Sequence, residues 1–141
     1  MALKIRTARG EDYDAIIALW QRAGLPYEPE GRDSRVAIAR QIERSGHLIF
    51  AAEDDEGGLI GVVFGSHDGR KGWINRLAVD PAHRRRGLAQ RLVTTAEEAL
   101  RHEGLSIVTA LIEDYNSASM ALFKRLGYAE RRDIVYFRKV F

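Results

Sequence analysis

The pattern of apolar and polar residues is most informative over residues 73–101, where it predicts a strand followed by a helix. Leu77 and Val79 alternate around a small residue, as in a strand that covers Trp73–Val79. Asp80-Pro81 ends this strand, because proline has no backbone donor and restricts the residue before it. Apolar residues then recur at helical spacing on one face, at Leu88, Ala89, Leu92, Val93, Ala96, Ala99 and Leu100.

The same reasoning predicts the other elements. Strands are expected over Leu3–Arg6, Leu48–Glu53, Leu59–Gly65, Ser106–Ile112 and Ile134–Val140. Helices are expected from Gly10 to about Ala23, from Ser34 to about Gly46, and from Ser117 to Leu126. Residues 24–33 are rich in proline, glycine and acidic side chains, which predicts a loop between the first two helices. Elements of both kinds interleave, so we expect an α/β or α+β domain with a mixed sheet covered by helices.

Length and composition narrow the class of protein. The chain has 141 residues, of which 45% are hydrophobic and 30% charged, so we expect a single soluble domain over residues 1–141. The sequence contains no cysteine, which excludes disulfides, thiolate metal sites and a cysteine nucleophile. The N-terminal residues lack the apolar core of a signal peptide, and no apolar run approaches membrane-spanning length. The expected location is therefore the cytoplasm, with no membrane partner.

A run of arginines lies between the central strand and its helix. Arg84-Arg85-Arg86-Gly87 leads into the first helical turn, where backbone N–H groups have no intrahelical acceptor. These groups and the helix dipole favour an anion, and a glycine lets the anion approach the main chain closely. Arginine side chains add forked donors that suit phosphate. The stretch therefore predicts a phosphate-binding loop, the alternative being a solvated basic loop before an ordinary helix.

The spacing of this loop carries a family resemblance. Arg84-x-x-Gly87-x-Ala89, entered from the strand and Asp80-Pro81, resembles the acetyl-CoA signature R/Q-x-x-G-x-G/A of the GCN5-related N-acetyltransferase (GNAT) family. The resemblance implies an acyl-CoA N-acyltransferase-like fold with the element order β-α-α-β-β-β-α-β-α-β, and acetyl-CoA as co-substrate. It also implies that acetyl-CoA contacts a set of residues on the strand, the loop and the helix: Leu77, Ala78, Val79, Arg84, Arg85, Arg86, Gly87, Leu88, Ala89 and Gln90.

A second segment is similar to the same family. Asn116, followed after six residues by Phe123 and then by Leu126-Gly127-Tyr128, resembles the pattern N-x6-Y-x-x-L-G-F/Y. The resemblance implies that Asn116 and Phe123 lie against CoA. The family's tyrosine, whose hydroxyl protonates the leaving thiolate, is replaced here by Phe123. An asparagine cap, an amphipathic helix and a glycine stop explain the same residues without any ligand.

Acetyl transfer to an amine needs groups that handle protons. A free alkyl amine has a pKa of about 10, so a general base or a lowered pKa is needed for attack at neutral pH. The central strand carries no glutamate before Leu77, unlike many relatives. Glu113 and Asp114 are the nearest candidates for the base by topology, and Glu53 is another. Tyr115 is our candidate for the acid that replaces the missing hydroxyl, with water as the alternative.

The acceptor and other partners are less defined by the sequence. Tyr27, Glu28 and Glu30 lie in the loop that borders the acceptor site in the family, and acidic residues there would attract a cationic amine. The expected acceptor is a small-molecule or peptide amine. The four histidines have no metal-ligand spacing, so we expect no metal. The sequence leaves a homodimer open.

Two other functions remain as alternatives. The first is a non-catalytic acetyl-CoA sensor or interaction module that kept the fold but lost the acid at Phe123. The second is a nucleic-acid-binding domain that uses Arg84-Arg85-Arg86 and Arg131-Arg132. The net charge of only +2, with no aromatic residues between these arginines, argues against a nucleic-acid partner.

Overall fold

The computed structural model describes residues 3–141. These residues fall into two compact units, of which the first ends at Leu111 and the second covers Ile112–Phe141. The first unit contains a five-stranded sheet and three α-helices. Its elements in chain order are β1 (Lys4–Thr7), α1 (Tyr13–Ala23), α2 (Arg35–Ser45), β2 (Ile49–Glu53), β3 (Leu59–His67), β4 (Gly72–Val79), α3 (Leu88–His102) and β5 (Val108–Ala110). Short 3₁₀ turns cover Gly10–Asp12, Gly46–Leu48 and Pro81–His83. The second unit contains α4 (Ser117–Arg125).

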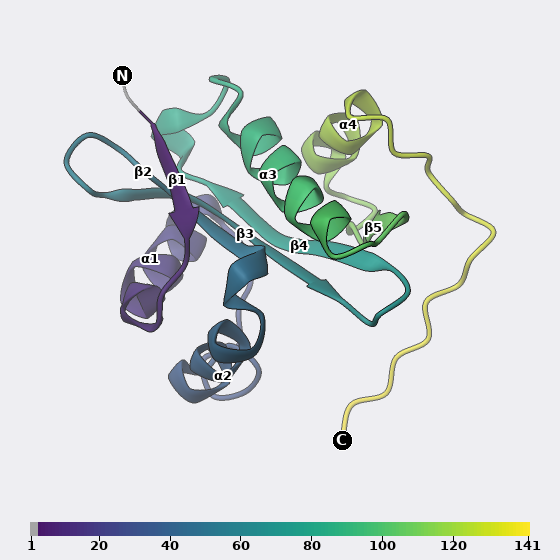
Figure 1. The fold of residues 1–141 in the computed structure, drawn as a ribbon, viewed down its shortest axis with the longest axis horizontal. Helices are drawn as coiled ribbons and strands as arrows, with labels where there is room; N and C mark the ends of the chain where they lie inside the picture. The colour runs from purple at the N-terminus through teal and green to yellow at the C-terminus, as the bar shows by residue number, and fades with distance from the viewer. Residues whose placement is uncertain (1–2) are drawn as a thin grey trace. The chain divides into compact units, whose positions relative to one another are not determined.

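The sheet is mixed, as predicted. Its strand order is β1-β2-β3-β4-β5, so neighbours in the sequence are also neighbours in space (Figure 1). The first four strands pair antiparallel and are joined by short connections or by the α1–α2 segment. The pairing of β4 with β5 is parallel, and α3 forms the crossover between them.

Apolar side chains cover both faces of this sheet. One core combines α1 and α2 with one face of the strands, and its fully buried members include Ile16, Leu19, Trp20, Ile49, Ala51 and Val62. On the other face lies α3, whose buried residues are Leu88, Leu92, Val93, Ala96 and Leu100 (Figure 1). A Cβ atom added at Gly61 would lie 2.8 Å from Leu92 Cδ1, and one at Gly72 would lie 2.9 Å from Leu100 Cδ1. These glycines therefore let α3 pack closely on β3 and β4.

Most of the predicted boundaries are confirmed within a few residues. The Ser34 hydroxyl accepts a hydrogen bond from the Ala37 amide at 3.2 Å, which is the expected cap of α2. The Asp54 side chain accepts bonds from the amides of Glu56 and Gly58 and closes the β2–β3 turn. The helix predicted from Leu88 begins at that residue. These features depend on residues close together in the chain, which explains why the sequence predicts them.

Two predicted strands differ from the structure. The strand predicted over Ser106–Ile112 is reduced to Val108–Ala110, and Ile134–Val140 forms no strand at all, so the expected order lacks its last element. The residues of this last segment have high β-propensity, and Ile134, Val135, Tyr136 and Phe137 are exposed. A strand also needs a partner for its backbone groups, and no described strand pairs with this segment.

A network of charged residues joins β1 to its surroundings. Both terminal nitrogens of Arg6 donate to the carboxylate of Asp12, at 2.8 and 2.9 Å, and its Nε donates to Glu53 at 3.0 Å. Burial alone would raise the pKa of Asp12, but the hydrogen bonds from Arg6 and from the Arg9 amide outweigh it and hold that pKa below its usual value. Asp12 is therefore expected to stay ionised at neutral pH and to stabilise the start of α1.

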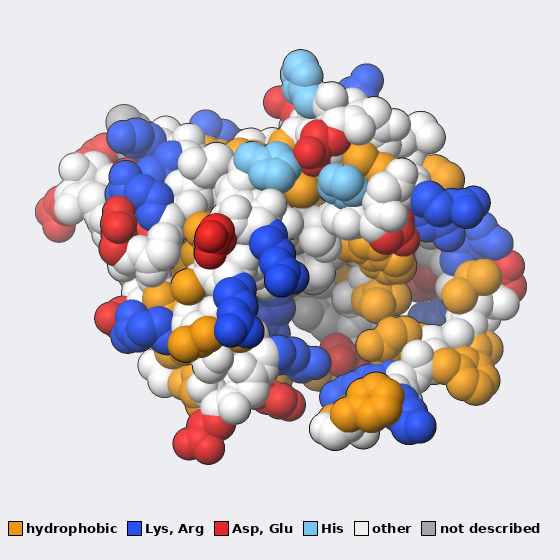
Figure 2. All heavy atoms as spheres, turned by 60° about the horizontal axis from the view of Figure 1, so that its bottom comes forward, with side chains coloured by type: hydrophobic (Ala, Val, Ile, Leu, Met, Phe, Trp, Pro, Cys, Tyr) orange, Lys and Arg blue, Asp and Glu red, His pale blue; other side chains and the backbone are white. Residues whose placement is uncertain are grey.

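The surface carries charges of both signs. Figure 2 shows Lys and Arg side chains interspersed with Asp and Glu on the face that it presents. None of the helices described over residues 3–141 is long and apolar enough to cross a membrane.

Candidate active site

Strand β4 contains an irregularity next to the predicted acetyl-CoA residues. Val62 pairs with Ala78 and Phe64 with Asn75, so Val63 of β3 faces two residues of β4, Arg76 and Leu77. This is a β-bulge, and Arg76 has a φ of 53° in the left-handed region. Such a conformation is strained for a residue with a side chain and is common at functional sites.

The bulge directs Arg76 toward α1 and the α1–α2 loop. Its guanidinium carbon lies 4.0 Å from the centre of the Trp20 ring, and Nη1 donates to the Pro26 carbonyl at 2.9 Å. Nη2 lies 3.5 Å from Asp33 Oδ2. Burial lowers the pKa of Arg76, and the Asp33 carboxylate acts in the opposite direction. The side chain thus connects β4 to both ends of the α1–α2 loop.

The loop itself has an ordered internal structure. The buried Asp33 carboxylate accepts a hydrogen bond from the Glu28 amide at 2.8 Å, and the Tyr13 hydroxyl donates to the Asp33 carbonyl at 2.7 Å. Tyr27 is half-buried, and its hydroxyl accepts a bond from Gln21 Nε2 at 2.6 Å. Of the residues predicted for the acceptor site, Tyr27 therefore packs against α1, whereas the side chains of Glu28 and Glu30 are exposed.

Beyond the bulge, β4 has an open edge. The parallel pairing with β5 covers only Gly72 to Ile74, opposite Val108 to Ala110. From Asn75 to Val79, the strand has a partner in β3 on one side and no described strand on the other. The predicted residues Leu77, Ala78 and Val79 lie in this stretch, and strand addition by a ligand uses a strand edge of this kind.

A capped turn joins β4 to the arginine loop. Asp80 Oδ1 accepts a bond from the Ala82 amide at 2.9 Å, and Asp80 Oδ2 accepts one from Arg22 Nε at 2.9 Å. The bond from Ala82, and then that from Arg22, lower the pKa of Asp80. Arg22 also donates to the Leu59 carbonyl at 3.1 Å. The turn is thereby tied to α1 and to the start of β3, which fixes where the loop begins.

The arginine loop enters α3 without a side-chain cap. Gly87 is the N-cap residue with a φ of 73°, and the first amide to donate back into the helix is that of Arg91, to the Gly87 carbonyl at 3.0 Å. Arg85 also has a positive φ of 66°. The side chains of Arg84, Arg85 and Arg86 are exposed. The predicted residues Leu88, Ala89 and Gln90 form the first turn, whose amides are suited to an anion.

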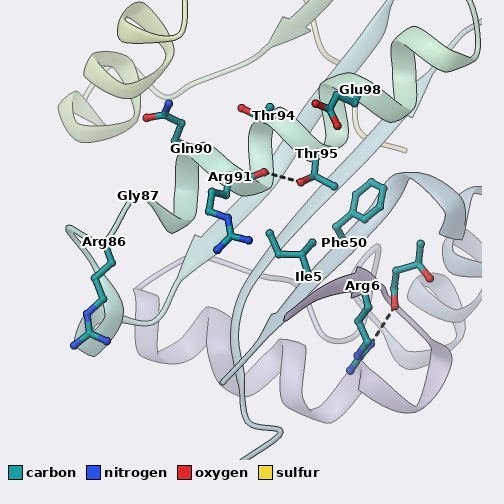
Figure 3. A pocket seen from close by; sticks show the side chains of 11 residues that line it. Ile5, Arg6, Phe50, Arg86, Gly87, Gln90, Arg91, Thr94, Thr95 and Glu98 are labelled. Atoms are coloured by element: carbon teal, nitrogen blue, oxygen red, sulfur yellow. Dashed lines mark hydrogen bonds between the residues drawn. The ribbon is translucent and has the colours of Figure 1, made fainter. Parts of the chain in front are cut away.

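A pocket of about 910 Å³ lies on one flank of α3. It is lined by Ile5, Arg6 and Thr7 of β1, Phe50 of β2, Arg86 and Gly87 of the loop, and Gln90, Arg91, Thr94, Thr95 and Glu98 of α3. Figure 3 shows Arg91 and Thr95 extending from α3 toward the side where Ile5 and Phe50 lie. The pocket includes part of the predicted CoA loop, but not Leu77, Ala78 or Val79. It lies over β1 and β2, at the other end of the strand order from the open edge.

The remaining predicted site residues belong to the second unit. Asn116 caps α4, where its Oδ1 accepts a bond from the Ser119 amide at 3.1 Å. Phe123 is buried and meets Tyr128 edge-on, with ring centres 4.9 Å apart. Tyr115 has 74% of its surface exposed, and Glu113 is exposed as well. The structure thus gives Asn116 and Phe123 local packing roles, and the catalytic assignment of Glu113 and Tyr115 stays a prediction.

Other polar residues have structural partners. Glu53, a candidate base by sequence, forms an ion pair with Arg6 and is half-buried. His47 Nε2 and His67 Nε2 lie 2.9 and 3.4 Å from the two carboxylate oxygens of Glu103. Within residues 3–141, no group of three or more His, Cys, Asp or Glu is arranged to hold a metal ion.

Comparison with known proteins identifies the family. The model of the acetyltransferase (GNAT) family matches residues 13–128. An acetyltransferase of Photorhabdus laumondii, plu1384, is 31% identical over 138 residues, which cover 97% of this chain and 94% of the relative. The chain belongs to the GNAT family. The predicted family and enzyme class, an acetyl-CoA-dependent N-acetyltransferase, are thereby confirmed.

Solved structures confirm the fold. AAC(6')-Iy in complex with the bisubstrate analogue CoA-S-monomethyl-acetylneamine has a TM-score of 0.79 and 20% identity, with 100% of both chains covered. The NatC complex bound to Gag peptide and CoA has a TM-score of 0.78 and 22% identity, with 94% of this chain and 87% of that chain covered. At this level of identity the likeness concerns the fold alone.

Sequence reasoning missed two features of the region around β4. The first is Arg76, whose left-handed conformation depends on the pairing of β3 with β4. The second is the contact of Arg22 with Asp80, which joins residues 58 positions apart. Asp80-Pro81 was a visible turn signal, but nothing in the sequence pairs its carboxylate with an arginine of α1.

Proposed function

We propose that this GNAT protein transfers the acetyl group of acetyl-CoA to a primary amine by direct attack in a ternary complex. The amine nitrogen forms a bond to the acetyl carbonyl carbon, the carbon–sulfur bond breaks, and the amine loses a proton. The thiol of CoA and an N-acetyl amide are the products. The observation that carries this proposal is the open edge of β4, followed by an uncapped helix with Gly87 at its start.

The first unit offers a distinct group for each part of acetyl-CoA. The first-turn amides of α3 and the exposed arginines Arg84, Arg85 and Arg86 suit the phosphates. The backbone of Leu77, Ala78 and Val79 suits the amide-bearing arm, and an N–H near Leu77 or Ala78 suits the oxyanion that forms during attack. Family membership supports this assignment, because the relevant residues match the family's signature.

The acceptor is proposed to approach along the loop over residues 24–33. Exposed Glu28 and Glu30 give this loop a negative charge that favours a cationic amine. The two solved relatives carry an acetylneamine analogue and a peptide, so the fold accommodates both small-molecule and peptide ligands. Glu113 is proposed as the base and Tyr115 as the acid, on the basis of their positions in the sequence.

Release of free thiol tests the proposal directly. The chain has no cysteine, so a thiol-reactive dye reports only the CoA that the reaction releases. We expect turnover with at least one member of a panel containing a polyamine, an aminoglycoside, an amino acid and a short peptide with a free N-terminus. Absence of thiol release with every amine, while calorimetry still detects acetyl-CoA binding, would contradict the catalytic proposal.

One observation favours a second function. Phe123 has no hydroxyl and packs against Tyr128, so the position that supplies the acid in the family cannot donate a proton here. A protein that binds acetyl-CoA without catalysis would have this feature. The thiol of CoA has a pKa near that of cysteine, about 8.5, so the thiolate leaves tolerably well without an acid. For this reason we favour a slower enzyme.

A further inference from the structure

Arg76 has an energetically unfavourable backbone conformation. A φ of 53° suits glycine, and an arginine there is strained. In addition, its Nε is buried and has no hydrogen-bond partner among the described residues. Unfavourable features of this kind persist where the surrounding contacts hold the residue in place. The contacts of Arg76 should therefore reveal what it does.

Two of these contacts are with the loop over residues 24–33, and the third is with α1. The planar guanidinium stacks on Trp20, whose side chain is fully buried in α1. The position of the guanidinium is therefore fixed by the core. Nη1 donates a hydrogen bond to the Pro26 carbonyl near the start of the loop, at 2.9 Å. Nη2 lies 3.5 Å from the carboxylate of Asp33 at the end of the loop. Only 6% of the Asp33 side chain is exposed, so solvent screens this ion pair little.

We propose that Arg76 is a positioning residue that holds the loop over residues 24–33 against β4 and so sets the affinity for the amine acceptor. This rests on the proposed function, in which the same loop borders the acceptor site. Asp33 also contributes to the structure of the loop, because its carboxylate accepts a hydrogen bond from the Glu28 amide. This bond fixes the backbone that carries Glu28 and Glu30. Arg76 acts through this loop, without contact to the reacting atoms.

Three substitutions test this role separately from the formation of the bulge. Arg76→Gly removes the side chain and keeps the bulge, because glycine adopts a positive φ without strain. Arg76→Lys keeps the charge, but it loses the planar group that stacks on Trp20. Asp33→Asn removes the ion pair and keeps an oxygen for the Glu28 amide. Arg70→Gly, in the exposed turn before β4, is the control for loss of an arginine side chain away from the loop.

The first measurement is limited proteolysis, which needs no substrate. Glutamyl endopeptidase can cleave after Glu30 in the loop and after Glu56 in the exposed β2–β3 turn, which serves as an internal control. Loss of the contacts between Arg76 and the loop should speed cleavage after Glu30 by roughly tenfold in Arg76→Gly, because local opening of the loop becomes easier. Cleavage after Glu56 should be unchanged, and Arg70→Gly should behave like the wild type. Equal rates of cleavage after Glu30 in the wild type and in Arg76→Gly would refute the proposal that Arg76 holds the loop.

The second measurement is steady-state kinetics with the amine of the panel that gives the highest kcat/KM. In Arg76→Gly and Asp33→Asn, KM for the amine should rise roughly tenfold, and kcat and KM for acetyl-CoA should change by less than about twofold. The double variant should be no worse than Arg76→Gly alone, and Arg76→Lys should recover part of the affinity. The proposal would be overturned if KM for the amine and KM for acetyl-CoA rose in parallel, or if KM for the amine did not change. If no amine is acetylated, the proposed function fails, and proteolysis still decides whether Arg76 holds the loop.

Discussion

Replacement of Gly87 by alanine tests whether acetyl-CoA approaches the main chain at the start of α3. Gly87 has a φ of 73°, and a Cβ atom added there would meet no protein atom within 4 Å. The cost to the free protein is therefore conformational, about 1–2 kcal/mol for a left-handed alanine. The cost to the complex is larger, because the new methyl group occupies the space through which a phosphate would reach the amides.

The loss of binding can be estimated from the contacts concerned. A hydrogen bond to a charged group contributes about 1.5–3 kcal/mol, so losing one amide–phosphate bond should weaken binding roughly 10–100-fold. Gly104, just beyond the other end of α3, provides a matched control. It has a φ of 89° and equally open space around its Cβ position, so Gly104→Ala carries the same conformational cost away from the loop.

Two assays together give the answer. Urea unfolding should show a similar loss of stability in Gly87→Ala and Gly104→Ala, about 1–2 kcal/mol in each. Isothermal titration calorimetry with acetyl-CoA should show weaker binding only in Gly87→Ala. If both variants bind acetyl-CoA as tightly as the wild type, the phosphates do not approach Gly87 and the assignment of this loop is wrong.

Three further predictions concern catalysis, the acceptor and stability. Phe123→Tyr should raise kcat if the missing hydroxyl limits the rate, and Tyr115→Phe should lower kcat by up to about 10²-fold. If chemistry is rate-limiting and Tyr115→Phe keeps the wild-type kcat, Tyr115 has no part in the mechanism. Charge reversal at Glu28 and Glu30 should raise KM for a cationic amine and leave KM for acetyl-CoA unchanged; if both constants stay the same, these residues are only part of the surface. The pKa of Asp12 is lowered in the folded state, so Asp12→Asn should destabilise the protein at neutral pH. This deficit should shrink as the pH falls through the lowered pKa, and urea unfolding as a function of pH measures it.

The predictions that succeeded depend on residues near one another in the chain. The apolar face of α3 follows from helical spacing alone, and the Ser34 cap involves the amide only three residues later. The turn after Asp54 and the arginine loop before α3 likewise depend on residues close together in the chain. Short-range hydrogen bonds and steric limits act in the same way whatever the rest of the chain does, so the sequence by itself determined these elements. The loop's resemblance to the GNAT signature then identified the family.

Other features depended on contacts between distant segments. Whether Ile134–Val140 forms a strand depends on a partner for its backbone groups, which β-propensity cannot supply. The strain at Arg76 exists because β3 and β4 pair with one residue facing two, and because Trp20, Pro26 and Asp33 meet its side chain from elsewhere in the chain. The sequence therefore determined the local elements and the position of the arginine loop before α3. Only the tertiary structure decided how the loop over residues 24–33 is held, because that depends on which distant residues packing brings together.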